Sequence, residues 1–231
     1  MKKTFLLSCL MLAAMPVMAA YTGHVYVDKN KNGVFDQSEK PLAGIKVSDG
    51  LNVVETAADG SFTLPGHERE RFIFITTPSG YKTFNRHYHK IEKKQSGYDF
   101  GLIPYSGRIR KDGSHRYIHI TDTEIFNTEN HADWVNNVHD YARNEQAAFI
   151  IHTGDLCYEK GLKAHIKLMN TENMDCPVFY CIGNHDLVKG KYGEELFESI
   201  YGPVYYSFDA GNVHYVCLLY TSPSPRDLST S

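Results

Sequence analysis

The sequence predicts two regions of different fold class in series: a small all-β sandwich, then an α/β domain built on a largely parallel sheet. Residues 21–104 contain short β-branched or alternating runs separated by turn residues, a spacing typical of a sandwich. In residues 105–216, short apolar runs alternate with longer polar stretches of helical character. That alternation is typical of βαβ units, in which the strands lie parallel.

Composition sets broad limits on function. The 231 residues are 42% hydrophobic and 22% charged, with a formal net charge of -3. These values are ordinary for globular domains. A slightly acidic chain is not expected to take nucleic acid or an anionic membrane surface as a general partner. After residue 20, no apolar run is long enough to cross a membrane.

Residues 1–20 are expected to form a secretory signal peptide. Lys2 and Lys3 precede an apolar run, Pro16 interrupts it, and Ala19 offers a small residue for cleavage. The run is too short for a stable membrane anchor, and the alternative is a buried N-terminal helix. A cleavable signal implies a periplasmic or secreted protein whose mature chain has no transmembrane segment.

Residues 21–104, called the β module below, contain five runs that we expect to be strands. Turn signals such as Ser48-Asp49-Gly50 and Pro65-Gly66 stand between them. The predicted strands cover residues 24–27, 45–47, 53–56, 61–64 and 72–76.

One loop of the β module matches the pattern of a calcium loop. Oxygen-bearing side chains recur at positions 1, 3, 5, 9 and 12, with Gly33 at position 6. The flanks are strand-like rather than helical, so we expect a structural ion held by a β-module loop. The alternative is a polar turn without metal. The candidate calcium ligands are Asp28, Asn30, Asn32, Asp36 and Glu39.

The α/β domain is expected to begin with a strand over residues 117–121, followed by a helix over 131–145. The spacing of Trp134, Val138 and Tyr141 predicts that these side chains share one face of that helix. A second strand, a second helix and a third strand follow, and then a hairpin. Their predicted ranges are 148–151, 160–173, 178–182 and, for the hairpin strands, 205–208 and 213–216.

Residues 217–231 have a different origin in our interpretation. The string from Cys217 to Asp227 resembles the in-frame translation of a transposase adapter used in sequencing libraries. We therefore expect an assembly artefact at this end, and the native protein to continue differently. The alternative is an ordinary disordered tail rich in serine and proline.

Three short polar motifs each follow a predicted strand: Asp122-Thr123-Glu124, Gly154-Asp155 and Gly183-Asn184-His185-Asp186. Because ligand sites of α/β sheets form where the strands end, we expect these motifs to converge. Carboxylates, an amide oxygen and an imidazole suit Mn, Fe or Zn. Taken singly, each residue also fits a helix cap or a turn, so the ordered set carries the prediction.

With these motifs, residues 117–216 resemble the calcineurin-like metallophosphoesterases, whose pattern is Asp-x-His, Gly-Asp and Gly-Asn-His-Asp/Glu. The β module resembles the N-terminal domain often fused to secreted phosphoesterases. The resemblance implies an incomplete β-sandwich flanked by helices as the phosphoesterase core. It also implies two divalent metal ions and hydrolysis of phosphate mono- or diesters by a metal-bound hydroxide. The substrate would be a small-molecule or lipid phosphate ester.

The resemblance also assigns roles to single residues. Asp122 would bind the first metal, Asp155 would bridge both, and Asn184 would bind the second. His185 would protonate the leaving alcohol or stabilise the transferring phosphoryl group, and Asp186 would orient His185.

Two departures from the family pattern qualify these expectations. Glu124 stands where the family usually has a histidine ligand, and it is expected to ligate as a carboxylate. The family's later histidine motifs are missing, since His214 is the last histidine. We therefore expect this form of the chain to be inactive. The competing interpretation is a non-enzymatic exported surface protein or carbohydrate-binding protein. No Gly-x-Ser-x-Gly motif supports a serine hydrolase.

Overall fold

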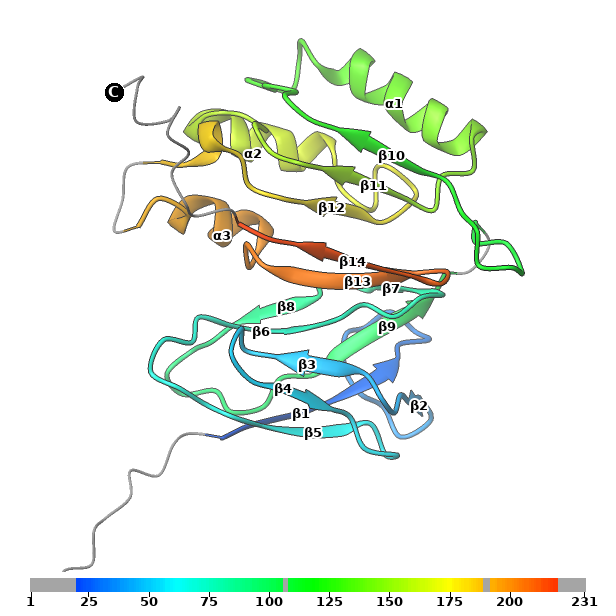
Figure 1. Cartoon of the computed structure of the whole chain (residues 1–231), viewed down its shortest axis with the longest axis vertical. Helices are drawn as coiled ribbons and strands as arrows, with labels where there is room; N and C mark the ends of the chain where they lie inside the picture. The colour runs from blue at the N-terminus through cyan, green and yellow to red at the C-terminus, as the bar shows by residue number, and fades with distance from the viewer. Residues whose placement is uncertain (1–19, 106–107, 189–191, 220–231) are drawn as a thin grey trace, which may run out of the picture.

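The computed structural model describes residues 20–105, 108–188 and 192–219 (Figure 1). It confirms the predicted fold class, a β-rich N-terminal part followed by an α/β part with a parallel sheet. Residues 1–19 of the predicted signal peptide lie outside the described residues. Its last residue, Ala20, is the first residue of the first strand. Residues 220–231 of the predicted artefact also lie outside them. Among the described residues, no helix is long and apolar enough to span a membrane.

One sheet of the β module is arranged around its first strand, β1 (Ala20–Val27). This strand pairs antiparallel with β2 (Lys40–Pro41) and β5 (Ser61–Pro65), and parallel with β9 (Phe100–Pro104). The strand β7 (Tyr81–Thr83) pairs with the far side of β9. The parallel β1–β9 pair therefore brings the two ends of the module together.

The second sheet has the order β4 (Val53–Glu55), β3 (Lys46–Ser48), β6 (Phe72–Ile75) and β8 (Tyr88–Lys90), with antiparallel neighbours throughout. Apolar side chains from both sheets form a single core. The fully buried ones are Val25, Val47, Leu64, Ile73, Ile75 and Leu102.

All five predicted strands of the β module are present, as parts of β1, β3, β4, β5 and β6. The other four strands were not predicted. The strand β9 is an apolar run of five residues, whereas β2, β7 and β8 have two or three residues and are partly polar, as in Tyr88-His89-Lys90. Their strand conformation depends on pairing with a neighbour, because such runs have little β-propensity of their own.

In the α/β part, β10 (Tyr117–Ile120), β11 (Phe149–His152) and β12 (Val178–Tyr180) form a parallel sheet in that order. Two helices, α1 (Ala132–Asn144) and α2 (Glu159–Leu168), lie on one side of it (Figure 1). Neighbouring residues of β11 point to opposite faces of the sheet. Ile150 packs in the core that includes α1, whereas Phe149 packs in the core that includes the hairpin.

The helix face that carries Trp134, Val138 and Tyr141 is not the one that α1 buries against the sheet. Val135 and Ala142 are buried, while Trp134 and Tyr141 are exposed. Only Val138 of the predicted set packs against the core. An α-helix has 3.6 residues per turn, so Val135 and Ala142, each one residue after Trp134 and Tyr141, lie on a neighbouring face. That face packs against the sheet and leaves the two aromatic rings exposed.

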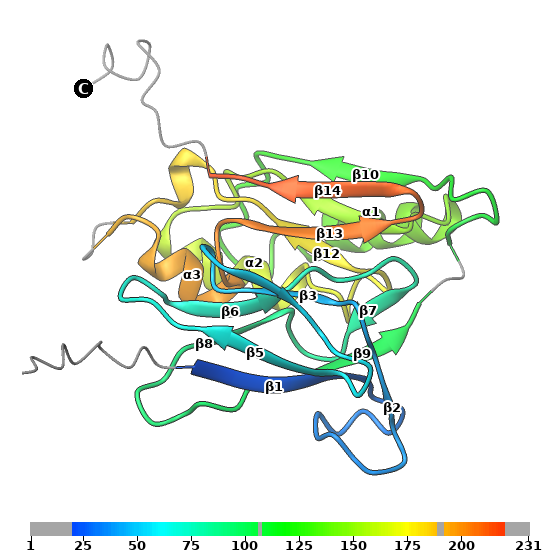
Figure 2. The same ribbon diagram turned by 60° about the horizontal axis from the view of Figure 1, so that its bottom comes forward.

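The hairpin of β13 (Tyr206–Ala210) and β14 (Val213–Cys217) agrees with the prediction to within two residues. It lies between the parallel sheet and the β module (Figures 1 and 2). Phe208 stacks on Phe179 with ring centroids 3.5 Å apart, and the N–H of Asp209 donates to the Thr77 carbonyl at 2.8 Å. Phe72, Phe74 and Tyr88 of the β module join the same buried cluster. The two parts of the chain therefore share a hydrophobic core.

Candidate metal centre

The three motif loops lie against one another at the carboxyl ends of β10, β11 and β12. The N–H of Asp122 donates to the Gly154 carbonyl at 3.2 Å, so the first two loops are joined through their backbones. The N–H of His185 donates to Oδ1 of Asp155 at 3.0 Å, which joins the second loop to the third. Segments about 30 residues apart in the sequence thus form one polar surface.

Three candidate ligands have strained backbones. Asp122, Glu124 and Asp155 have φ angles of 55°, 44° and 50°. They are half of the six non-glycine residues with positive φ in the described part of the chain. Side-chain-bearing residues pay about 1–3 kcal/mol for such conformations, which persist where surrounding contacts fix them, as at functional sites.

The candidate metal ligands lie on one surface, but their ligand atoms do not surround a common point. Oδ2 of Asp122 accepts a hydrogen bond from the Thr121 hydroxyl at 2.6 Å. Asn184, the first residue of the 3₁₀ turn η1 (Asn184–Asp186), has an exposed side chain. Within the described residues, no three acidic or imidazole donors of this surface lie within 4.8 Å of one another. The metal-binding roles of these residues therefore remain predictions.

His185 is oriented by contacts from two loops. Its Nδ1 lies 3.3 Å from Oε1 of Glu124, and its ring stacks on Tyr158 with centroids 5.1 Å apart. The side chains of His185 and Glu124 are 37% and 43% exposed. Among the described residues, Nε2 of His185 has no hydrogen-bond partner, whereas Nδ1 faces Glu124.

Asp186 does not occupy the place that the resemblance implied. Its Oδ2 accepts from the N–H of Gly183 at 2.8 Å, and its Oδ1 accepts from the N–H of Cys157 at 3.1 Å. Glu124, rather than Asp186, contacts the His185 ring. Burial raises the pKa of Asp186 to about 6, although the backbone donors act in the opposite direction. Asp186 thus ties η1 to the loop after Asp155.

A buried residue next to the first loop, His152, belongs to none of the sequence motifs. His152, the last residue of β11, is fully buried, and its Nε2 lies 2.9 Å from Oγ1 of Thr123. Thr123 stands between Asp122 and Glu124. The only signal in the sequence is the position of His152 at a strand end, immediately before Thr153-Gly154-Asp155.

The candidate calcium loop is wound around its carboxylates. Asp28 is buried and accepts from the N–H groups of Asn32 and Gly33, at 3.2 and 2.9 Å. Glu39, also buried, accepts from Asp36 N at 3.2 Å and from Lys29 N at 2.9 Å. The side-chain amides of Asn30 and Asn32 both donate to Oδ2 of Asp36.

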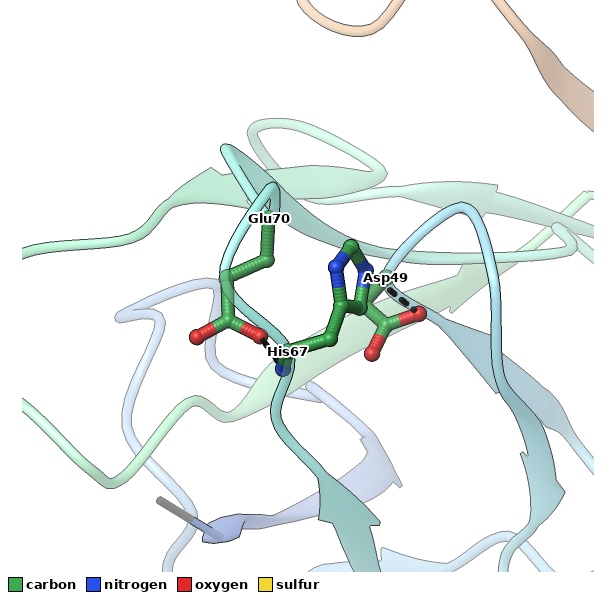
Figure 3. Close-up of side chains that lie close together, drawn as sticks. All are labelled: Asp49, His67 and Glu70. Atoms are coloured by element: carbon green, nitrogen blue, oxygen red, sulfur yellow. Dashed lines mark hydrogen bonds and ion pairs between the residues drawn. The ribbon is translucent and has the colours of Figure 1, made fainter. Parts of the chain in front are cut away.

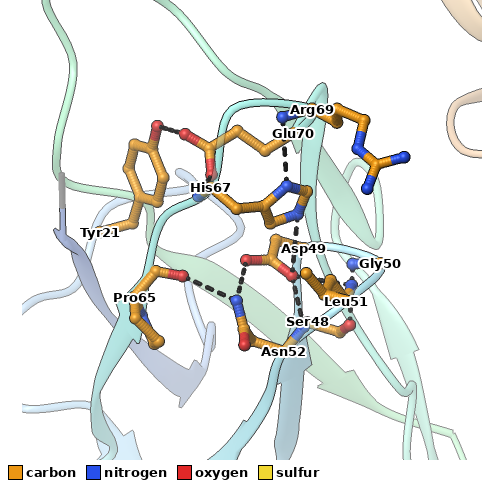
Figure 4. A network of polar contacts seen from close by, with 10 residues as sticks. All are labelled: Tyr21, Ser48, Asp49, Gly50, Leu51, Asn52, Pro65, His67, Arg69 and Glu70. Carbon is orange, nitrogen blue, oxygen red and sulfur yellow. Dashed lines mark hydrogen bonds and ion pairs between the residues drawn. The ribbon is translucent and has the colours of Figure 1, made fainter. Parts of the chain in front are cut away.

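A separate cluster in the β module was not predicted. Asp49, His67 and Glu70 are the one group of three acidic or imidazole residues, among those described, whose donor atoms all lie within 4.8 Å (Figure 3). Glu70 accepts from the Tyr21 hydroxyl and from the His67 N–H. Asp49 accepts from the backbone and side-chain N–H groups of Asn52 (Figure 4). The carboxylates therefore already have hydrogen-bond partners.

The imidazole of this cluster fits a neutral ring packed beside Asp49 better than a metal ligand. His67 Nδ1 accepts from the Arg69 N–H at 3.2 Å, so the neutral ring has its proton on Nε2. That nitrogen faces Oδ1 of Asp49 at 3.5 Å. A metal-bound histidine normally donates through its other nitrogen, which this ring cannot do. The cluster thus joins two turns of the β module.

A parallel sheet with helices on one face and carboxylate-bearing loops at its strand ends defines an α/β domain with a polar strand-end site. Family comparison gives the particular family. Residues 115–222 match the calcineurin-like phosphoesterase model, and residues 29–104 match the model of the N terminal of calcineurin-like phosphoesterase. The chain therefore belongs to the calcineurin-like phosphoesterases, which are metal-dependent hydrolases of phosphate esters. No curated protein matches the chain significantly.

Proposed function

We propose that Asp122, Glu124, Asp155 and Asn184 bind divalent metal ions, with Mn, Fe or Zn as the candidates, in an enzyme that hydrolyses phosphate mono- or diesters. The observation that supports this most directly is the meeting of three strand-end loops, whose carboxylates sit on strained backbones. Strain of this kind is found where function requires a fixed side-chain position. The substrate would be a small-molecule or lipid phosphate ester.

The chemistry of the donor set fits such ions. Three carboxylates and one amide oxygen suit borderline or hard divalent cations, and the absence of thiolates in these motifs disfavours softer ions. When bound, a pair of divalent ions neutralises phosphate charge and lowers the pKa of water. Asp155, whose Oδ1 already accepts from the His185 backbone, joins the second and third loops and is the best candidate for a bridging ligand.

His185 would supply the proton that the leaving alcohol needs. Its Nδ1 contacts Glu124, so the proton would be delivered from Nε2. Stacking on Tyr158 limits rotation of the ring. In this arrangement Glu124 would have two roles, as a metal ligand and as the partner that orients the imidazole.

Two further points belong to the same proposal. The family's later histidine motifs are not among these 231 residues, so we infer that this form binds metal weakly and is inactive. The signal peptide predicted over residues 1–20 would direct export to the periplasm or the medium. A purely carbohydrate-binding role is less well supported, because it gives no reason for strain at Asp122, Glu124 and Asp155.

The test is Mn²⁺ binding by the 231-residue chain, measured as loss of the electron paramagnetic resonance signal of free Mn²⁺. Asp155→Asn should weaken binding at least about tenfold, whereas Asp140→Asn, an exposed carboxylate of α1, should leave it unchanged. Hydrolysis of an aryl phosphate monoester and diester with added Mn²⁺ is then measured on both variants. Equal binding by the wild type and Asp155→Asn would remove the proposed bridging ligand.

A further inference from the structure

The loop with Asp122 and Glu124 is anchored by the one side chain between them. Both flanking residues have positive φ, so the loop needs outside contacts to keep its shape. Thr123 supplies one, because its Oγ1 lies 2.9 Å from Nε2 of His152. His152 is fully buried at the end of β11. The loop is therefore attached to the interior of the domain through Thr123.

A second buried histidine stands beside the first. His165 of α2 is also fully buried, and its ring meets that of His152 edge to face, with centroids 5.2 Å apart and planes at 89°. Its Nδ1 lies 3.0 Å from the hydroxyl of Tyr201 in α3 (Glu195–Tyr201). That hydroxyl lies 2.9 Å from the Leu162 carbonyl. Polar groups thus run from the first motif loop to the last helix.

Proton positions in this series follow from the groups at its end. A carbonyl only accepts, so both Tyr201 contacts are hydrogen bonds only if Tyr201 donates to Leu162 and accepts from Nδ1–H of His165. Nε2 of His165 is then a bare acceptor. Within the described residues, Nε2 of His165 and Nδ1 of His152 are buried atoms without a hydrogen-bond partner.

We propose that Thr123, His152, His165 and Tyr201 form one directed hydrogen-bonded chain that holds the Asp122–Glu124 loop in its strained conformation. Thr123 donates to Nε2 of His152 and His165 donates to Tyr201, while one water bridges Nδ1–H of His152 and the bare Nε2 of His165, since neither atom has a direct partner. His152 is thereby a positioning residue. Only the expected effect of His152 on metal binding rests on the proposed function. The hydrogen-bonded series itself is a property of the fold.

Two observations support this proton order. Burial lowers the pKa of His152 to about 4 and that of His165 well below its ordinary value. Both rings are therefore neutral near pH 7, and each has one bare nitrogen. In the opposite order, Thr123 would donate to the Leu156 carbonyl at 3.4 Å. That carbonyl already accepts from the Ile125 N–H at 3.1 Å, and two bare nitrogens would be left facing each other.

The tautomers can be read directly by nitrogen NMR of the chain labelled with ¹⁵N-histidine, at pH 7. We expect His152 and His165 both to be protonated on Nδ1. Tyr201→Phe keeps the ring but removes the acceptor at the far end, so it should shift the imidazole ¹⁵N signals of His152 as well as those of His165. An Nε2-protonated His152, or a His152 signal unaffected by Tyr201→Phe, would overturn the proposal.

The positioning role has its own test, which uses matched variants. Thr123→Val removes the hydroxyl at nearly constant volume, whereas Thr123→Ser keeps it. We expect Thr123→Val to lower Mn²⁺ affinity about tenfold and Thr123→Ser to bind like the wild type, with both folded by circular dichroism. Wild-type affinity in Thr123→Val would overturn the role. If the wild type itself bound no Mn²⁺, the proposed function would fail, while the tautomer result would still decide the hydrogen-bonded chain.

Discussion

Gly154 and Gly183 touch at the point where the second and third motif loops meet. A Cβ on Gly154 would lie 2.5 Å from the Cα of Gly183, and a Cβ on Gly183 would lie 2.2 Å from the backbone nitrogen of Asp155. Real Cβ atoms do not approach other atoms so closely. The two loops can therefore pack only without side chains at these positions, which explains both glycines of the motifs sterically.

The Gly183→Ala variant should be destabilised by about 2 kcal/mol, because the added methyl forces the two loops apart. Gly183 has a φ of -105°, so backbone strain does not contribute to the loss. Gly97→Ala is the matched control, since a Cβ there meets nothing within 4 Å. The measurement is urea unfolding of both variants. Equal stabilities would show that the loops can separate without cost.

Acid should destabilise the protein through its buried histidines. The pKa of His152 falls from 6.5 to about 4 on folding, so between these values the unfolded chain binds more protons than the folded chain. The free energy of unfolding is therefore highest above about pH 6.5. It falls by about 3 kcal/mol through this residue as the pH drops toward 4. His165 acts in the same direction.

The measurement is urea unfolding from pH 7.5 to pH 4.5, on the wild type and on His152→Gln. The variant has no titrating ring at this position, so its stability should depend less steeply on pH. Identical slopes for the two proteins would contradict a neutral, buried His152.

The shared core is reinforced by an ion pair between Arg71 of the β module and Glu198 of α3. The Nη2 of Arg71 lies 2.6 Å from Oε1 of Glu198, whose side chain is 2% exposed. Arg71→Ala would leave this carboxylate buried without its partner and should cost about 2 kcal/mol. Because the Arg71 side chain is half-exposed, solvent screens this ion pair, and the loss of stability is smaller than for a fully buried pair. Arg71→Lys, which keeps the charge, should cost less; thermal unfolding of both variants gives the comparison.

Glu124 should control which metal is preferred. Replacing this carboxylate with the imidazole usual in the family, by Glu124→His, should raise affinity for Zn²⁺ relative to Mn²⁺, because nitrogen ligands suit zinc better than manganese. Competition between the two ions, followed calorimetrically, measures the ratio. An unchanged ratio would mean that residue 124 does not ligate and serves only to orient His185.

The loop from Asp28 to Glu39 should bind Ca²⁺. At about 10 mM Ca²⁺, an extracellular-type site should stabilise the protein by about 1–3 kcal/mol. Asn30→Ala removes an exposed oxygen ligand and should reduce this gain, whereas Asn136→Ala in α1 should not. The measurement is thermal unfolding with and without Ca²⁺. No stabilisation of the wild type by Ca²⁺ would identify the loop as a polar turn.

The local sequence was enough to predict the elements whose apolar residues follow a clear pattern. The three parallel strands and the hairpin came out within two residues, because runs such as Phe149-Ile150-Ile151 are short and rich in aromatic and β-branched residues, which favour strands. Strands such as β8, with Tyr88-His89-Lys90, have no such pattern and form only because β6 pairs with them. The helix α2 was predicted to continue to residue 173, but it ends at Leu168. The reason is that the side chain of Asn170 accepts from the N–H groups of Glu172 and Asn173 and turns the chain.

By itself, the sequence determined which side chains stand at the strand ends, because motif residues and strand periodicity are both local properties. Only the tertiary structure decided how they are used: Glu124 rather than Asp186 meets His185, and buried His152 stands behind Thr123. The physical reason is that a side chain's direction is set by packing across distant segments. Local patterns contain no information about which groups lie on the other side of a contact.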